Sequence, residues 1–229
     1  MRALAAKASG TTRKTHLRHG APEPLFGVRI GDMKPIAKQI KGDQELAMRL
    51  YATGNSDAMY LAGLVADGRQ MTRAQVQRWA QDATWHMISG TTVPWVAAEH
   101  PEGMDMALEW IDSPKELMAV AGWGTLCNLI ITTPDEELPV KRLDALLKRV
   151  VKTLKSSPNL VRYAMNNFVI CCGTYMAPLA DKAVETARKL GKVEVDMGDT
   201  ACQVPEAESC ILKSRRGAPI APKRKTTRC

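Results

Sequence analysis

The sequence predicts an all-α fold in which pairs of helices stack into a solenoid. Ala, Leu and Met are abundant, and only 5% of the residues are Phe, Trp or Tyr, a bias that favours helices over sheets. Apolar residues recur at helical spacing through most of the chain. These patterns form roughly six to nine helices, and helix pairs return about every 30–40 residues. No strict motif repeats, so the expected solenoid is degenerate.

Turn residues separate the expected helices in the first half of the chain. Asp32 and Thr72 are suitable N-caps, and Gly42, Gly54 and Gly68 end the helical patterns before them. The helices expected here cover 33–41, 43–51, 57–67 and a segment that opens at Thr72.

Proline marks most of the expected helix starts in the second half. Proline at the first helical position costs no hydrogen bond and fixes a helical φ. The strongest start is Thr133-Pro134 with three acidic residues after it, which favour the positive end of the helix dipole. The helices expected here are one that starts at Pro101 and others over Ser113–Ile131, 135–156, Ser157–Cys172 and Met176–Leu190. Residues 191–212 lose the helical period and are expected to wrap back over the helices.

The formal charge of +8 lies in the two ends of the chain. Residues 1–20 carry +5 and residues 213–229 carry +7, each without an acid, which leaves −4 for residues 21–212. This distribution predicts a flexible basic tail over 1–22, a single domain over 23–212 and a basic tail over 213–229. A mobile basic C-terminal tail beside a groove would raise affinity for nucleic acid non-specifically.

Composition also excludes several classes of protein. No run of about 18 apolar residues exists, so neither a membrane span nor a membrane partner is expected. The N-terminus lacks the apolar core of a secretory signal, although its basic, hydroxyl-rich character leaves an organelle transit peptide as an alternative. The six cysteines contain no C-x-x-C pair, so reduced, inert thiols are expected, with no metal and no cofactor. A metal or redox role stays open only if Cys202, Cys210 and Cys229 meet in space.

One stretch, Arg78–Trp95, concentrates the residues that could form a site. It holds three of the five tryptophans, among them Trp85, together with His86 and a Ser-Gly-Thr-Thr run. Helical spacing places Trp85 and Ser89 on one face. Such a face is either part of the core or the wall of a binding site.

Four segments carry a resemblance by their order and spacing: Leu25–Ile30 (LFGVRI), Tyr51–Asp67, Arg78–Trp95 and Trp110–Ser113. Over about residues 25–190 the chain resembles the DNA alkylation repair (AlkD-like) family. The resemblance implies a HEAT-like stack of antiparallel helix pairs whose concave face holds duplex DNA. It also implies hydrolysis of the N-glycosidic bond of N3- or N7-alkylated purines, aided by a carboxylate that stabilises the forming sugar cation.

The site positions that the resemblance implies are matched only in part. Trp85 stands where the family has its first site tryptophan. Ser89 stands where the family places its Asp, Asn167 lies near the position of a second tryptophan, and Val120 lies near that of a DNA-contacting Arg. A serine cannot supply a negative charge, and loss of one such electrostatic group typically costs roughly 100- to 1000-fold in rate. The resemblance therefore supports the fold and leaves the catalysis open.

Trp85, His86 and Ser89 are candidates for a DNA-facing pocket wall, with Trp85 against a sugar or base and the other two toward phosphate. The alternative is a core tryptophan whose neighbours cap local backbone groups. A nucleophilic Ser89–His86 pair would need a third orienting group, and none is evident. The catalytic candidates are Ser89 and Asp82. Asp82, on the same expected helix face, is either a displaced carboxylate or a solvated surface residue.

The remaining DNA-binding candidates lie nearer the C-terminus. Asn166 and Asn167 are unusual inside an apolar helix. With Arg162 they could bond phosphates or a base edge, and the alternative is a partly buried pair that satisfies a neighbouring loop. Lys155 belongs to a basic face of 135–156 that either contacts phosphates or is simply solvated.

Together, the sequence and the resemblance predict a monomeric, HEAT-like protein that binds damaged or distorted double-stranded DNA. The expected location is the cytoplasm, in association with the nucleoid. Three activities stay open: excision of alkylated purines, DNA binding without chemistry, and a protein-interaction scaffold of the kind that solenoids often form.

Overall fold

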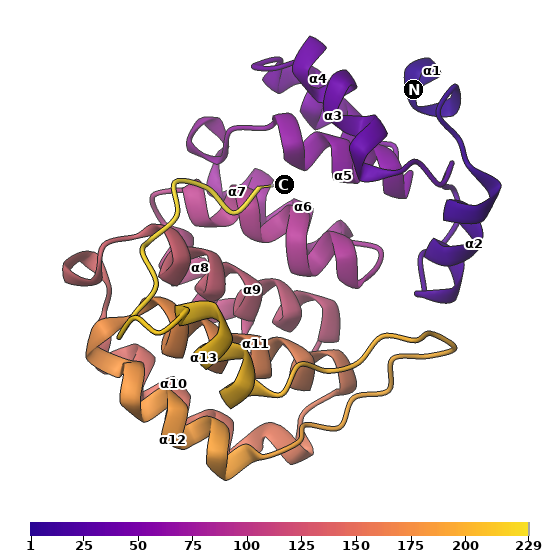
Figure 1. Cartoon of the computed structure of the whole chain (residues 1–229). Coiled ribbons are helices and arrows are strands. Elements are labelled where there is room, and N and C mark those ends of the chain that lie inside the picture. The colour runs from indigo at the N-terminus through magenta and orange to yellow at the C-terminus, as the bar shows by residue number, and fades with distance from the viewer. Residues whose placement is uncertain (229) are drawn as a thin grey trace.

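Thirteen α-helices make up most of residues 1–228, the part of the chain that the computed structural model describes (Figure 1). The α-helices are α1 (Arg2–Ala5), α2 (Gly10–Arg18), α3 (Ile30–Gln39), α4 (Gln44–Ala52), α5 (Ser56–Val65), α6 (Arg73–Asp82), α7 (Val93–Glu99), α8 (Gly103–Trp110), α9 (Glu116–Thr132), α10 (Val140–Thr153), α11 (Asn159–Tyr175), α12 (Ala180–Leu190) and α13 (Ala207–Arg215). The short elements are the π-helix η2 (Ile88–Thr92) and the 3-10 helices η1 (Gly68–Gln70), η3 (Asp135–Glu137), η4 (Leu154–Ser156) and η5 (Ala177–Leu179). In these residues the only β-type pairing is an isolated bridge between Ala8 and Val28, so the predicted all-α fold is confirmed.

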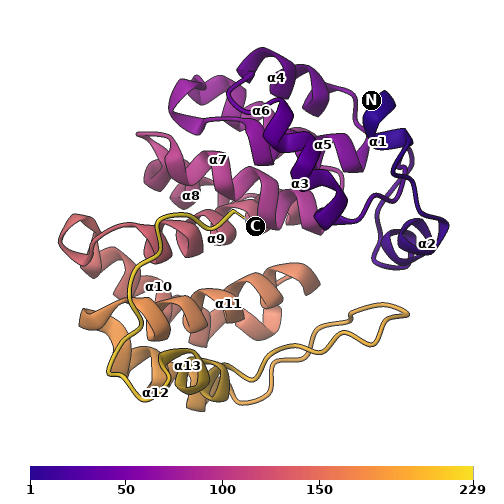
Figure 2. The same cartoon turned by 45° about the horizontal axis from the view of Figure 1, so that its top comes forward.

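The helices stack in layers, from α3–α5 at one end of the molecule to α10–α13 at the other (Figures 1 and 2). An inner series runs through the stack: α5 packs on the π-helix, α7 packs on α9, and α9 packs on α11. The buried residues form two clusters, one centred on the layers before α8 and one on those after it. Trp110 and Trp123 are fully buried in these clusters. Each layer therefore packs mainly on its neighbours, as expected for a solenoid.

Side-chain caps explain several helix starts. Asp43 accepts a hydrogen bond from the N–H of Leu46 at the start of α4, and Asn55 does the same for Ala58 at the start of α5. Thr72 and Gln75 form a capping box at the start of α6. Such caps satisfy backbone donors that have no partner within the helix. Asp32, however, lies in the first turn of α3 instead of capping it.

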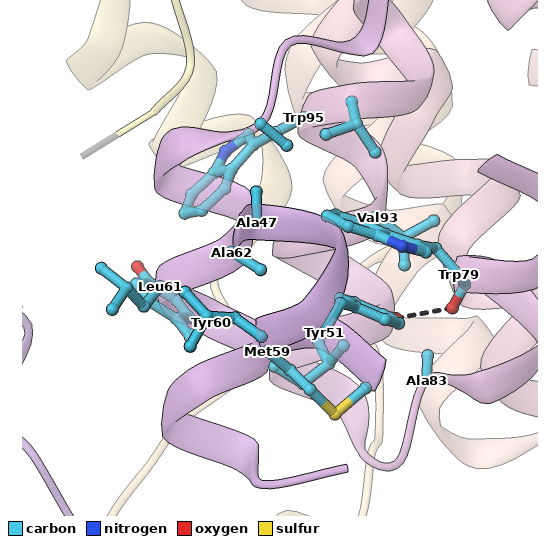
Figure 3. Close-up of a cluster of buried hydrophobic side chains, with 14 of the residues drawn as sticks. Ala47, Tyr51, Met59, Tyr60, Leu61, Ala62, Trp79, Ala83, Val93 and Trp95 are labelled. Atoms are coloured by element: carbon cyan, nitrogen blue, oxygen red, sulfur yellow. Dashed lines mark hydrogen bonds between the residues drawn. The ribbon is translucent and has the colours of Figure 1, made fainter. Parts of the chain in front are cut away.

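Two of the tryptophans in the Arg78–Trp95 stretch belong to the core (Figure 3). Tyr51 stacks on Trp79 with ring centroids 3.9 Å apart, and its hydroxyl donates to the Trp79 carbonyl at 2.6 Å. Burial raises the pKa of Tyr51 well above its ordinary value, and Asp82 adds to this effect. Trp95 packs edge-on against Tyr60 at 5.3 Å. These rings fix the packing of α4 and α5 on α6 and α7.

The helix expected over 135–156 begins later than predicted. Residues Asp135–Glu137 form a single 3-10 turn, and α10 starts only at Val140. Pro139 explains the difference, because proline has no N–H for a helical bond and its ring clashes with the carbonyl four residues earlier. The Thr133-Pro134 pair and the acidic residues after it correctly predicted a helical turn. This turn is a 3-10 helix, however, and not the first turn of an α-helix.

The predicted flexible tail over 1–22 is wrong in this structure, because α1 and α2 occupy most of it. Leu4 is 1% exposed, and α1 packs on α3. The Ser9 hydroxyl accepts a hydrogen bond from the N–H of Thr12 and caps α2. The segment contains one buried leucine and one capped helix. This apolar pattern is too short to predict helices in a segment that is otherwise basic and free of acidic residues.

Residues 191–212 also differ from the prediction, because α13 begins at Ala207. The Glu206 carboxylate accepts hydrogen bonds from the N–H groups of Glu208 and Ser209, and Ile211 is fully buried against α11. Residues 191–206, called here the 191–206 loop, have no regular structure. This loop extends from the lower layers toward α2 in both views (Figures 1 and 2).

The basic C-terminal segment is docked on the stack and does not form a mobile tail. Residues Arg216–Arg228, called here the C-terminal strap, run from α13 across the layers toward α7 (Figures 1 and 2). The strap contacts the carboxyl ends of three inner helices. Ala221 N–H donates to the Thr174 carbonyl of α11, and Arg224 N–H donates to the Ile131 carbonyl of α9. Arg228 donates to the carbonyl of Ala66, which ends α5, at 2.7 Å.

Cationic side chains of the strap complete these contacts. Lys223 Nζ donates to the Ile130 carbonyl at 2.7 Å and lies 2.7 Å from a carboxylate oxygen of Asp135. Arg228 also pairs with Glu99 of α7 at 2.8 Å. The last carbonyls of a helix lack intrahelical partners and carry partial negative charge, so lysine and arginine stabilise them. The strap therefore joins α5, α7, α9 and α11 along one edge.

Candidate nucleic-acid interface

The Arg78–Trp95 stretch contains a helix break that its pattern does not reveal. Helix α6 ends at Asp82, and the chain becomes helical again at His86, continuing through the π-helix into α7. The prediction that Asp82 and Ser89 share one helix face is therefore wrong. Pro94 accounts for the π-helix, because it cannot donate to the carbonyl of Gly90 and would crowd it in an α-helix.

Trp85 lies just before this second helix and is buried, with 4% of its surface exposed. Its carbonyl accepts hydrogen bonds from the N–H groups of Ile88 and Ser89, both at 3.0 Å. The indole packs against His16 of α2, with centroids 5.6 Å apart, and against His86 at 5.1 Å. In this arrangement α2 covers Trp85, so DNA can reach the ring only after α2 moves.

A buried carboxylate lies close to Trp85 and was not among the predicted site residues. Asp57 accepts hydrogen bonds from the N–H groups of Phe26, Gly27 and Val28 at 2.6, 2.9 and 2.8 Å. It lines a small cavity together with Trp85. The Leu25–Ile30 segment and the capped start of α5 are both visible in the sequence, but nothing in their spacing shows that they meet. Asp57 holds this turn in place.

The two catalytic candidates do not form a site with Trp85. Ser89 is fully buried, and its hydroxyl donates a long hydrogen bond to the His86 carbonyl at 3.5 Å. Asp82 is exposed at the end of α6 and pairs with Arg78 at 2.5 Å. Val120, at the position that resembles an arginine site, is 6% exposed.

Asn166 and Arg162 hold the base of the 191–206 loop. The Asn166 amide is buried and donates to the Pro205 carbonyl at 2.9 Å. Arg162 donates to Asn159 at 3.1 Å, and Asn159 exchanges two hydrogen bonds with the backbone of Asp196, at 2.7 and 2.8 Å. For Asn166 the alternative of satisfying a neighbouring loop therefore describes the structure. Asn167 is half-buried and Lys155 is exposed, and their contact with DNA stays a prediction.

The inner helices α5, α7, α9 and α11 share one direction. Their carboxyl ends lie along the C-terminal strap, as described above. Their amino ends also meet: the start of α5 and the helix that begins at His86 border one cavity, and the Glu116 carboxylate of α9 accepts from the Leu160 N–H of α11 at 2.7 Å. We call this side the amino edge. Helix amino ends carry partial positive charge and attract anions, and here the carboxylates of Asp57 and Glu116 already lie at two of them.

Helix α2 and the 191–206 loop meet in front of the amino edge. His19 Nε2 lies 4.0 Å from Cys202 Sγ, and a side chain at Gly198 would come within 3.6 Å of the Arg18 carbonyl. The first and last layers of the stack are therefore in contact through these two segments. Cys202 is exposed at this contact, Cys210 lies on α13, and Cys229 lies outside the described residues.

Two kinds of feature are absent from residues 1–228. No helix in this range is both long and apolar enough to cross a bilayer. The same residues contain no group of three or more His, Cys, Asp or Glu side chains placed to hold a metal ion.

The histidines that surround Trp85 make stability depend on pH. Burial lowers the pKa of His16 and His86 from an ordinary value of 6.5, while Asp57 partly opposes this for His16 and His19 lowers both pKa values further. Below pH 6.5 the unfolded chain therefore binds more protons than the folded one. Stability is retained above this pH and falls as the pH drops toward the lowered folded-state values.

We expect the free energy of unfolding of the wild-type protein to decrease between about pH 7.5 and 5.5. His16→Gln and His86→Gln should each remove part of this decrease. Urea denaturation at a series of pH values measures it. Equal pH dependence in the wild type and in both variants would contradict the assignment.

Comparisons with known proteins agree with this geometry. The family model described as DNA alkylation repair enzyme matches residues 1–201. The uncharacterized protein Lin0241 of Listeria innocua and Lmo0209 of Listeria monocytogenes are each 35% identical over 218 residues, which cover 93% of this chain and 94% of theirs. A solved structure is described as a new family of proteins related to the HEAT-like repeat DNA glycosylases with affinity for branched DNA structures. It is 39% identical with a TM-score of 0.91, covering 100% of this chain and 97% of that one. The predicted HEAT-like solenoid is thus confirmed, and the chain belongs to the DNA alkylation repair enzyme family.

Proposed function

We propose that this protein binds branched or otherwise distorted duplex DNA through backbone contacts and shape, without excising bases. The affinity for branched DNA stated for the similar solved structure supports this proposal. Sequence-independent contacts of this kind come from cations and helix amino ends that meet phosphates. We further propose that it acts as a monomer in the cytoplasm, in association with the nucleoid.

The observation that carries the proposal is that Asp57, the carboxylate among residues 1–228 that shares a cavity with Trp85, is already engaged by backbone N–H groups. Glycosidic bond cleavage needs negative charge next to the sugar cation as it forms. Asp57 uses both carboxylate oxygens on backbone N–H groups, and Asp82 lies on a different helix, paired with Arg78. Ser89 is buried and neutral. None of these side chains is available for that role.

DNA binding is expected on the side of the amino edge. The strap cations Lys223 and Arg228 already pair with Asp135 and Glu99 at the opposite edge. Ion-paired cations release few counterions when a phosphate approaches, so they contribute little to DNA affinity. Exposed Lys155 and half-buried Asn167 remain candidates for further contacts.

A binding and release experiment tests the proposal. We expect a synthetic four-way junction to bind more tightly than a linear duplex of equal length, with affinity that falls steeply as salt rises. We expect no release of alkylated purines from methylated DNA above a buffer control. Release that is abolished by Trp85→Ala would establish a glycosylase instead. Absence of binding to either DNA would leave the scaffold alternative.

A further inference from the structure

Helix α2 presents a polar stripe to solvent. Thr11, Lys14, Thr15 and Arg18 follow the spacing i, i+3, i+4 and i+7, which places them on one face of the helix. These four residues, called here the α2 stripe, form an open surface patch that the exposed Leu17 borders. Both cations are exposed.

The cations of the α2 stripe differ from Arg13 in being free of ion pairs. Arg13, on another face of the same helix, pairs with Glu23. Lys14 and Arg18 form no ion pair with any residue in 1–228. Residues 1–22 contain no acid that could compete for them. A free, solvated cation is the kind that gains most from meeting a phosphate.

The opposite face of α2 fixes its position. His16 packs on Trp85, and His19 lies 6.4 Å from His86 between ring centroids. Gly27, at φ 75°, lies so close to α2 that a Cβ there would be 2.4 Å from the Arg13 backbone nitrogen. Because α2 is held this closely, its backbone does not have to be ordered when a ligand binds, which saves part of the entropy cost of association.

We propose that the α2 stripe binds the phosphodiester backbone of one arm of a branched DNA, beside the amino edge. This inference rests on the proposed function and assigns one of its contact surfaces. Charge complementarity identifies the partner: two free cations, two hydroxyl groups and no acid on a fixed helix suit a row of phosphates. The 191–206 loop contacts α2 near His19 and carries four acids and one lysine, so the DNA arm lies on the face turned away from that loop.

The test compares Lys14→Ala/Arg18→Ala with Lys34→Ala/Lys38→Ala. The control removes two exposed lysines from α3 that have the same spacing and no ion pair among residues 1–228, so both variants lose the same charge. Binding of a synthetic four-way junction is measured at several salt concentrations. We expect the α2 variant to lose roughly tenfold or more in affinity at low salt, with the salt slope reduced by about two. The control should stay within about twofold of the wild type, since it removes no backbone contact.

Two further measurements and two possible outcomes complete this test. Circular dichroism must show the same helix content in both variants, and Lys14→Arg/Arg18→Lys, which keeps both charges, should restore most of the affinity. Equal affinities for the α2 variant and the control, with a wild type that binds, would overturn the α2 stripe alone. A wild type that binds no junction would overturn the proposed function together with this inference.

Discussion

Replacing Asp57 with alanine is expected to destabilise the protein by about 3–5 kcal/mol, the largest effect of any single change considered. The carboxylate is 1% exposed and accepts three backbone hydrogen bonds from residues 26–28. Its removal leaves these donors without partners in a region closed to water, and each unsatisfied donor costs about 1–3 kcal/mol. Urea denaturation followed by circular dichroism measures the loss.

Asp57→Asn and Asp105→Ala complete this experiment. The amide keeps one acceptor oxygen but turns an NH₂ group toward the remaining donors, so an intermediate loss is expected. Asp105 lies on α8 with 69% of its side chain exposed, and its replacement should change stability by less than about 0.5 kcal/mol. A fully stable Asp57→Ala variant would show that the 26–28 turn does not depend on this carboxylate.

Removing two strap cations is expected to have the next largest effect. Lys223→Ala/Arg228→Ala should lower the free energy of unfolding by about 2–4 kcal/mol. The reason is that Ile130 and Ala66 lose charged donors to their carbonyls, while Asp135 and Glu99 lose their ion-pair partners. Thermal and urea denaturation provide the measurement.

Lys225→Ala is the matched control, because Lys225 lies in the same strap, is exposed and has no ion pair among residues 1–228. Its replacement should leave the free energy of unfolding unchanged. Binding of the four-way junction by folded Lys223→Ala/Arg228→Ala then shows whether these two cations only stabilise the fold or also contact DNA. Unchanged affinity is expected for a structural strap, whereas a loss comparable to that of the α2 variant would show that the strap itself contacts DNA.

The periodic parts of the fold were predictable from the sequence, and the short or irregular parts were not. Helices with a cap and an apolar stripe, such as α4 with Asp43, appear close to where their patterns place them. Helix α2 has no buried residue of its own, and its position depends on contacts with Trp85 and Gly27, far away in the sequence. Pattern analysis detects spacing along one segment and cannot detect such contacts.

In the candidate site, too, spacing along one segment was informative and contacts between distant segments could not be predicted. Helical spacing grouped Asp82 with Ser89, but the break at Ala83 and Thr84 separates them into two helices. Asn166 was correctly noticed as an unusual polar residue in an apolar helix, and its partner, the Pro205 carbonyl, became visible only in three dimensions. Asp57 could not be recognised because its three partners are backbone groups about thirty residues away.

The shared direction of the inner helices has a consequence for the kinetics of association. The strap cations neutralise the carboxyl ends of these helices, and the unpaired cations Lys14 and Arg18 lie on the α2 stripe, so positive charge is distributed unevenly over the surface. A long polyanion at a distance exerts a torque on such a molecule and rotates it before they collide, which raises the fraction of productive encounters. That gain should shrink once added electrolyte shortens the Debye length to about 10 Å, near 0.1 M, because charges farther apart than this distance are largely screened from each other.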